Sequence, residues 1–216
     1  MKTAVIVTGG MIEPEFAHSF LETHRYDYLI GVDRGIEFLK QDGKIPTHIV
    51  GDFDSSSKET LQWFQKKEGI EIRTFLPEKD ETDTQIAIDL AMERQCEAIY
   101  ILGGTGTRID HMLGNLQILS KPFQEGISCY LIDSHNRVRL CSDYLMLKKK
   151  EQFGTYVSLI PHSECVTGLT LKGFYYPLSN ARLDNKTSLG ISNEIVEEEA
   201  EIFLKTGELF VIESKD

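Results

Sequence analysis

Cysteine, proline and tryptophan are scarce in this sequence. The 216 residues include four cysteines, six prolines and one tryptophan, and no two cysteines form a CxxC pair. Scattered cysteines argue against a zinc or redox site and favour reduced, mostly buried thiols, as in a cytoplasmic protein. A chain of this length can bury enough apolar surface to fold without disulfide or metal cross-links.

Long apolar runs are also missing. The first apolar run ends at Thr8, where Gly9 and Gly10 follow, and this is too early for an export signal. No segment approaches the ~20 apolar residues of a membrane-spanning helix. We therefore expect a soluble cytoplasmic protein that does not bind a membrane.

Positive charge is in the minority. Lysine and arginine number 23 against 34 aspartates and glutamates, which gives a net charge of −11. This balance opposes binding to nucleic acid, because such binding depends on a basic surface. Phosphate ligands remain compatible with it, because clustered carboxylates can hold Mg²⁺, which in turn binds phosphates.

The first part of the chain, residues 1–136, alternates short runs of Val, Ile and Leu with helical patterns. Continuous apolar runs are typical of strands that are covered on both faces. The alternation predicts an α/β domain, with a mainly parallel, Rossmann-like sheet flanked by helices. We expect strands at 4–8, 28–32, 48–50, 70–75, 99–102 and 129–132, and helices at 82–94 and 110–119.

The second part, residues 137–216, contains short strand patterns and no convincing helix. Its length and composition predict an all-β domain, a sandwich or a roll. The turn residues 205–208 predict a hairpin between the last two strands, and the polar segment 179–186 reads as a loop. We expect strands at 138–141, 144–148, 155–160, 166–171, 195–199, 201–204 and 209–213.

Acidic residues gather where the strands of the α/β domain end. Asp33 follows one apolar run, residues 51–55 follow the next, and residues 77–83 and 102–111 follow two more. In open α/β sheets the ligand crevice lies outside the carboxyl ends of the strands. These loops should therefore share one rim.

Asp52 and Asp54 are the central pair of this rim. If the strand geometry continues through Phe53, both side chains point to the same side. Two like charges held together favour a bound cation, and ligands that are all oxygen favour Mg²⁺ or Mn²⁺. An isolated DxD is more often a solvated turn. The other carboxylates on the rim favour the metal site here.

A second set of signals points to phosphate. Gly103 and Gly104 follow a strand, Arg108 offers a fork suited to phosphate oxygens, and the next helix begins close by. Asp110 could bind ligand or simply hold Arg108. In the segment 79–83, one side chain is expected to cap the following helix, and Lys79 adds a mobile positive charge.

Taken together, these loops resemble the thiamine pyrophosphokinase family. The matching motifs are GDFDS at 51–55, KDETD at 79–83 and GGTGTRIDH at 103–111. In the second part the matches are residues 168–178 and 188–194. The resemblance covers nearly the whole chain, in order, and the combination is far more specific than any single motif.

The resemblance implies an ATP-dependent diphosphotransferase. Such an enzyme moves a pyrophosphoryl group from ATP to the hydroxyethyl oxygen of thiamine, giving thiamine diphosphate and AMP, and requires Mg²⁺. It also implies an α/β catalytic, nucleotide-binding domain at 1–136 and a β-sandwich thiamine-binding and dimerisation domain at 137–216. Family members are homodimers whose thiamine site is completed at the subunit interface.

The resemblance further implies roles for individual residues. The metal ligands would be Asp52, Asp54 and Asp83. The catalytic set would be Asp52, Asp54, Asp80, Asp83 and Arg108, with the base left open among Asp52, Asp80 and Asp83. The residues in contact with ATP would be Asp33, Gly35, Lys79, Gly103, Gly104, Arg108 and Asp110. The residues in contact with thiamine would be Ser188, Ser192 and Asn193.

Other readings of the same residues stay open. The nearest is a pyrophosphokinase for another alcohol, such as a hydroxymethylpterin, against which the 188–193 match argues. A non-catalytic nucleotide-binding sensor and an Mg²⁺-dependent phosphohydrolase are further alternatives. A sensor would bind ATP without releasing AMP, and a hydrolase would release phosphate without an acceptor.

Overall fold

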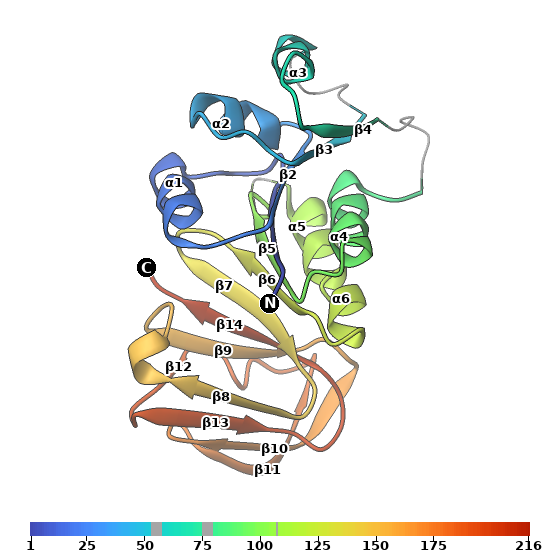
Figure 1. The fold of residues 1–216 in the computed structure, drawn as a ribbon. Coiled ribbons are helices and arrows are strands. Elements are labelled where there is room, and N and C mark those ends of the chain that lie inside the picture. The colour runs from blue at the N-terminus through green and yellow to red at the C-terminus, as the bar shows by residue number, and fades with distance from the viewer. Residues whose placement is uncertain (53–57, 75–79, 107) are drawn as a thin grey trace. The chain divides into compact units, whose positions relative to one another are not determined.

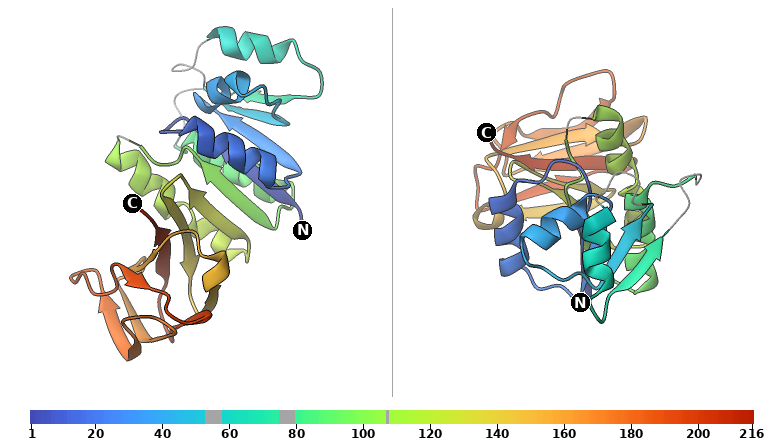
Figure 2. Two further views of the ribbon diagram at one scale, coloured as in Figure 1. Left: turned by 90° about the vertical axis from the view of Figure 1, so that its left-hand side faces the viewer. Right: turned by 90° about the horizontal axis from the view of Figure 1, so that it is seen from above.

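The computed structural model of this chain describes residues 1–52, 58–74, 80–106 and 108–216. The chain divides into two compact units, Met1–Ser134 and His135–Asp216. The first unit combines strands with helices, and the second consists mainly of strands with one short 3₁₀ helix at Lys149–Glu151 (Figures 1 and 2).

The first unit contains a parallel sheet in the order β6-β5-β1-β2-β3-β4. Its central strand β1 is buried along its whole length, as expected of a continuous apolar run. The α/β class predicted from the sequence is therefore confirmed, and each strand predicted for this unit is present with its ends shifted by at most one residue. The bounds are β1 Thr3–Val7, β2 Tyr28–Val32, β3 His48–Gly51, β4 Glu71–Thr74, β5 Ala98–Leu102 and β6 Ser128–Ile132.

Helices cover both faces of this sheet. Figures 1 and 2 show α1 and α2 against one face, and α4 and α6 against the other. The chain runs outward from β1 to β4 and then returns through α4 to β5, on the other side of β1. Right-handed crossovers require this reversal to change the face. The helices are α1 Pro14–Thr23, α2 Gly35–Gln41, α3 Lys58–Gln65, α4 Asp83–Glu93, α5 Ile109–Gln117 and α6 Ser120–Gln124.

Helix α4 follows the sequence signals closely. The Thr82 side chain caps it by accepting a hydrogen bond from the Gln85 N–H at 3.2 Å. The buried face includes Ala87, Ile88 and Leu90. The helix predicted at 110–119 is in fact α5, which ends at Gln117, followed by the short α6.

The second unit is a pair of antiparallel sheets with one shared apolar core. The strand orders are β12-β9-β14-β7 and β11-β10-β13-β8. Core residues from both sheets pack together, including Val157, Val211, Leu171 and Ile202. The strands are β7 Asn136–Cys141, β8 Tyr144–Lys148, β9 Tyr156–Pro161, β10 Cys165–Lys172, β11 Leu178–Asp184, β12 Asn193–Glu194, β13 Glu199–Phe203 and β14 Leu209–Ser214.

Three details of the predicted second unit are wrong. Segment 179–186 is largely strand β11, an edge strand whose polar residues face solvent while Leu183 is buried. Residues 195–199 are not one strand, because Ile195 forms only an isolated bridge to Phe174 before β13 begins. The strands flanking 205–208 form no hairpin, because β13 pairs with β8 and β10 whereas β14 pairs with β7 and β9.

None of the helices in the described ranges combines the length and the apolar character needed to cross a bilayer.

Candidate active site

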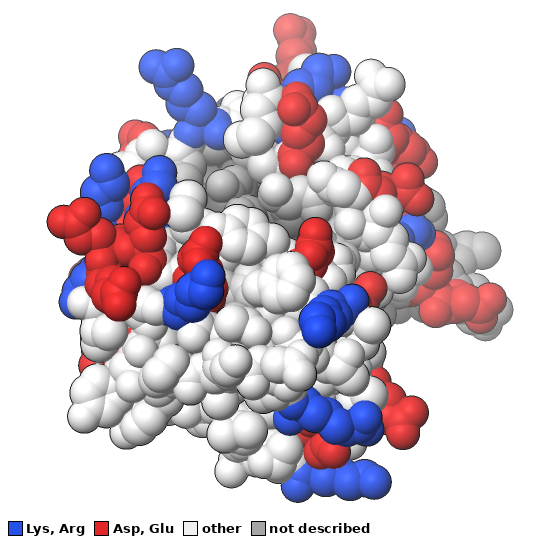
Figure 3. Space-filling model, turned by 90° about the horizontal axis from the view of Figure 1, so that it is seen from below, with Lys and Arg blue, Asp and Glu red and all other residues white. Residues whose placement is uncertain are grey.

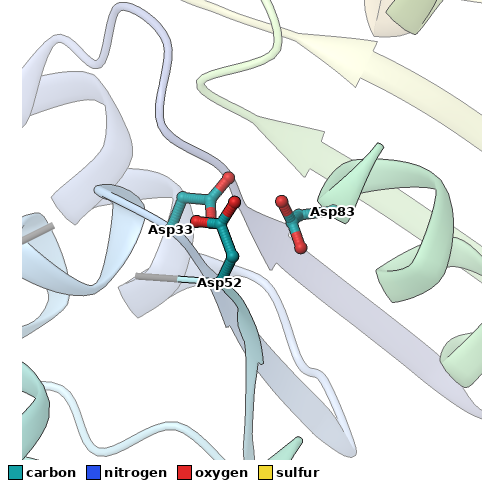
Figure 4. A group of neighbouring side chains, drawn as sticks. All are labelled: Asp33, Asp52 and Asp83. Atoms are coloured by element: carbon teal, nitrogen blue, oxygen red, sulfur yellow. The ribbon is translucent and has the colours of Figure 1, made fainter. Parts of the chain in front are cut away.

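Three carboxylates meet at the carboxyl ends of the parallel strands. Asp33 directly follows β2, Asp52 directly follows β3, and Asp83 is the first residue of α4. All three are half-buried, and each offers a carboxylate oxygen within 4.8 Å of the others (Figure 4). Three negative charges at this spacing are unfavourable without a cation or a bound proton, and the three carboxylates together could hold a metal ion.

The backbone at Asp33 is held in an uncommon conformation. Its φ of 47° is left-handed, and aspartate tolerates this region better than most residues do. The Asp33 N–H donates to the Val50 carbonyl at 3.2 Å, which links the ends of β2 and β3. Strained backbone of this kind is frequent at functional sites. The local turn thus brings the Asp33 carboxylate beside that of Asp52.

Asp83 reaches the group from the start of a helix. A carboxylate in the first helical turn is favoured by the exposed N–H groups and the helix dipole. The next residue, Thr84, is buried, and its hydroxyl lies 2.9 Å from the hydroxyl of Thr8 at the end of β1. This contact ties the first turn of α4 to the sheet and so helps to fix Asp83.

Two glycine-containing loops line the rim side by side. The N–H groups of Thr8, Gly10 and Met11 donate to the carbonyls of Leu102, Gly103 and Thr105 at 2.9, 2.9 and 2.7 Å. A Cβ on Gly10 would lie 2.3 Å from two of those carbonyl oxygens. The close pairing of these loops therefore requires glycine at position 10.

The other predicted glycines also have packing reasons. A Cβ on Gly35 would lie 2.0 Å from the Val7 carbonyl oxygen, and one on Gly104 would lie 2.2 Å from the Leu131 side chain. Gly103 has a φ of 71°, which favours glycine. These glycines let neighbouring segments of the rim pack closely together. Close packing alone accounts for glycine at these positions, and it is also compatible with a nucleotide pocket.

Arg108 and Asp110 form an exposed pair at the start of α5. The Arg108 Nε and Nη2 donate to the two carboxylate oxygens of Asp110 at 3.2 and 2.6 Å. This hydrogen-bonded guanidinium lowers the pKa of Asp110 to about 2. Of the two roles left open for Asp110, holding Arg108 is the one that this structure shows.

Of the other residues predicted for this rim, one lies outside the carboxylate group and two are not described. Asp80 is exposed and is not among the three carboxylates that meet. Asp54 and Lys79 lie outside the described residues. Asp33 was expected at the nucleotide, and its membership of the carboxylate group was missed. Its position directly after a predicted strand was the signal that could have revealed it.

The predicted thiamine residues belong to one segment of the second unit. Ser188 and Ser192 are exposed, and Ser192 has a φ of 56° with its N–H donating to the Ser158 hydroxyl at 2.9 Å. Asn193 is buried at 5% exposure. It contacts the segment of Tyr175 and Tyr176, two exposed aromatic residues whose rings pack edge to face at 4.8 Å. The sequence predicts no individual role for this tyrosine pair.

Comparison with known proteins identifies relatives over the whole chain. Residues 21–131 match the family described as thiamin pyrophosphokinase, catalytic domain, and residues 144–209 match thiamin pyrophosphokinase, vitamin B1 binding domain. Thiamine pyrophosphokinase of Bacillus subtilis is 36% identical over 218 residues, covering 100% of both chains.

Solved structures agree with this comparison. The crystal structure of the Bacillus subtilis thiamine pyrophosphokinase has a TM-score of 0.88 at 35% identity, again covering 100% of both chains. That of the Geobacillus thermodenitrificans thiamin pyrophosphokinase has a TM-score of 0.85 at 31% identity, covering 100% of this chain and 98% of that one. The resemblance seen in the sequence motifs is confirmed, and this chain belongs to the thiamin pyrophosphokinase family.

Proposed function

We propose that this chain transfers a pyrophosphoryl group from ATP to the hydroxyethyl oxygen of thiamine, giving thiamine diphosphate and AMP. The observation that carries the proposal is the group of Asp33, Asp52 and Asp83 at the strand ends of a unit that matches the family's catalytic domain. A pyrophosphoryl transfer needs bound cations and aligned substrates more than covalent chemistry, and carboxylates at such a rim can bind the cations.

The carboxylate group suits Mg²⁺. All the ligands are oxygen, which hard divalent cations prefer. Their carboxylate oxygens lie within 4.8 Å of one another, which is close enough for all three side chains to share one cation. We propose Asp33, Asp52 and Asp83 as ligands, with Asp54 as a further ligand outside the described residues. When bound, the ion would neutralise charge on the phosphate oxygens.

We place ATP along the same rim. The strand order reverses between β1 and β5, and in Rossmann-like sheets nucleotides bind at this switch point. The paired loops after β1 and β5 lie there, beside Gly35, Gly103 and Gly104. We propose that Arg108, whose guanidinium is hydrogen-bonded to Asp110, contacts phosphate oxygens. The same role is proposed for Lys79, which lies outside the described residues.

The chemistry balances without a covalent intermediate. The thiamine hydroxyl oxygen forms a bond to the β-phosphorus of ATP, and the bond from that phosphorus to the α–β bridging oxygen breaks, releasing AMP. The hydroxyl proton passes to a carboxylate, and Asp52, Asp80 and Asp83 are the candidates. Of these, Asp52 and Asp83 belong to the carboxylate group and Asp80 does not.

We place thiamine against the 188–193 segment of the second unit. The hydroxyl-bearing residues Ser188 and Ser192 are exposed there, and the faces of Tyr175 and Tyr176 are available nearby. Aromatic faces attract organic cations, and the thiazolium ring of thiamine carries a permanent positive charge. This unit matches the family's vitamin B1 binding domain over 144–209.

We further propose a cytoplasmic homodimer in which 1–136 is catalytic and 137–216 binds thiamine and dimerises. The exposed face of β8 and β13 carries Tyr144, Met146 and Phe203, which are 50%, 39% and 40% exposed. Seen from below, the molecule shows a broad uncharged area broken by isolated charged side chains (Figure 3). Exposed apolar surface of this kind is typical of subunit contacts.

An AMP-release assay with ATP and Mg²⁺, with and without thiamine, tests the reaction. We expect AMP only with thiamine, together with thiamine diphosphate identified by mass, and loss of both on adding EDTA. If AMP forms with a hydroxymethylpterin and not with thiamine, the pterin is the acceptor and the proposed substrate is wrong. Tight ATP binding without AMP in a folded protein would favour a sensor.

A further inference from the structure

The side chain of Asn193 makes all of its described hydrogen bonds to backbone groups. Its Oδ1 accepts from the Tyr176 N–H at 2.9 Å and from the Glu194 N–H at 2.9 Å. Its Nδ2 donates to the Tyr176 carbonyl at 2.8 Å. The amide therefore bonds both polar groups of one residue 17 positions away, while being only 5% exposed.

These bonds continue a short ladder between two segments. The Val196 N–H donates to the Gly173 carbonyl at 2.9 Å, and the Tyr175 N–H donates to the Glu194 carbonyl at 2.9 Å. Between these two contacts, the buried side chains of Phe174 and Ile195 join the core of the second unit. Beyond these backbone hydrogen bonds, the Asn193 side chain continues the pairing of the two segments through its hydrogen bonds to Tyr176.

We propose that Asn193 is a positioning residue that holds the Tyr175–Tyr176 pair in place for thiamine and does not itself contact the substrate. Both tyrosine side chains are exposed, at 63% and 62%, so packing against the core does not fix them. The backbone of Tyr176 is fixed instead by the Asn193 amide. The inference rests on the proposed thiamine reaction and assigns Asn193 a role different from that of Ser188 and Ser192.

Asparagine is the residue that fits this task. A primary amide offers a donor and an acceptor at one end, as a peptide group does. Aspartate keeps the acceptor, loses the donor and places a buried carboxylate against the Tyr176 carbonyl oxygen. Alanine loses both, and leaves the polar groups of Tyr176 without their described partner. Asn193→Asp and Asn193→Ala therefore disrupt the contact in two different ways.

Steady-state kinetics give the first test. We expect Asn193→Ala to raise the KM for thiamine by about 10-fold, the scale set by losing one or two hydrogen bonds. Asn193→Asp should raise it at least as much, because its carboxylate would be buried against the Tyr176 carbonyl oxygen. The KM for ATP should change less than about 2-fold, because positioning of the tyrosines concerns the acceptor. The matched control is Asn185→Ala, an exposed asparagine with no described contact, which should leave both constants unchanged.

A double-mutant cycle separates positioning from direct binding. In a Tyr175→Leu/Tyr176→Leu background the rings are gone, so adding Asn193→Ala should change the KM for thiamine less than about 2-fold. An undiminished effect in that background would mean that Asn193 acts on thiamine by another route, and would overturn the proposal. An unchanged KM for Asn193→Ala in the wild-type background would also overturn it.

Amide hydrogen exchange tests the same contact without thiamine. The Tyr176 N–H should be protected in the wild-type protein and exchange at least about 10-fold faster in Asn193→Ala, while Val211 in the core stays protected. If the Tyr176 amide exchanges faster in Asn193→Ala but the wild-type protein makes no thiamine diphosphate, the proposed reaction is wrong. The hydrogen bonds from Asn193 to Tyr176 would still be confirmed. If the enzyme is active and the Tyr176 amide exchanges equally in both proteins, the inference fails.

Discussion

The hydroxyl groups of Thr8 and Thr84 lie 2.9 Å apart in the interior of the α/β unit. Thr8 follows the central strand β1, and Thr84 follows Asp83, the carboxylate that reaches the rim from α4. One buried contact therefore joins the sheet to the helix that carries a proposed metal ligand. Its removal should affect both stability and metal affinity.

Thr84→Val keeps the side-chain shape and leaves the Thr8 hydroxyl buried without this partner. We expect it to lower the free energy of unfolding by about 1–3 kcal/mol, measured by urea denaturation. The Mg²⁺ concentration for half-maximal activity should rise as well. The double variant Thr8→Val/Thr84→Val removes both hydroxyls and should recover part of the stability. Equal stability of Thr84→Val and wild type would contradict the role of this contact.

Asp33→Asn tests whether the first carboxylate belongs to the metal site or to the nucleotide pocket. Asparagine also tolerates the left-handed conformation at this position, so the fold should be kept. If Asp33 is a metal ligand, loss of its carboxylate should raise the Mg²⁺ concentration needed for activity. It should also reduce kcat by at least about 100-fold, on the scale of removing an electrostatic catalytic group. Asp83→Asn provides the comparison. A raised KM for ATP at an unchanged Mg²⁺ requirement would assign Asp33 to the nucleotide.

Arg108→Gln tests the electrostatic coupling at the start of α5. Without the guanidinium, the pKa of Asp110 should rise from about 2 towards the ordinary aspartate value of 3.8. Because the folded pKa is lowered, the pair stabilises the protein at neutral pH, and this contribution fades as the pH falls from about 4 towards 2. NMR titration of the Asp110 carboxyl measures the shift. An unchanged titration curve would mean that Arg108 does not hold Asp110 in solution.

Gly10→Ala tests the paired loops of the rim. The added Cβ would lie 2.3 Å from the carbonyl oxygens of Gly103 and Thr105, so the loops must separate. We expect both a lower melting temperature and a large loss of activity. Gly114→Ala is the matched control, because a Cβ there meets nothing within 4 Å and the residue is helical. That change should stabilise the protein by about 0.5–1 kcal/mol.

Ser192→Ala tests the position of thiamine on the second unit. It removes an exposed hydroxyl, and Ser192 donates its backbone N–H, not its hydroxyl, to Ser158, so the local fold should be retained. We expect the KM for thiamine to rise more than the KM for ATP. The reverse pattern in steady-state kinetics would mean that ATP, not thiamine, binds at this segment.

Much of the fold follows from local sequence patterns. The continuous apolar runs predict the parallel strands because strands buried on both faces must be apolar throughout. Thr82 and the buried face of α4 predict that helix because capping and periodicity are local properties. The polar edge strand β11 was missed for the converse reason, since most of its side chains face solvent and only Leu183 is fully buried.

The sequence by itself determined the α/β and all-β parts, the order of the motifs and, through them, the family. Tertiary structure decided which distant residues meet. The fold brings Asp33 close to Asp52 and Asp83, and it brings the Asn193 amide within hydrogen-bonding distance of the Tyr176 backbone. It also sent β13 and β14 to different sheets, where a local turn pattern suggested a hairpin. Local propensity specifies how the chain turns, whereas pairing and packing between distant segments specify where each side chain arrives.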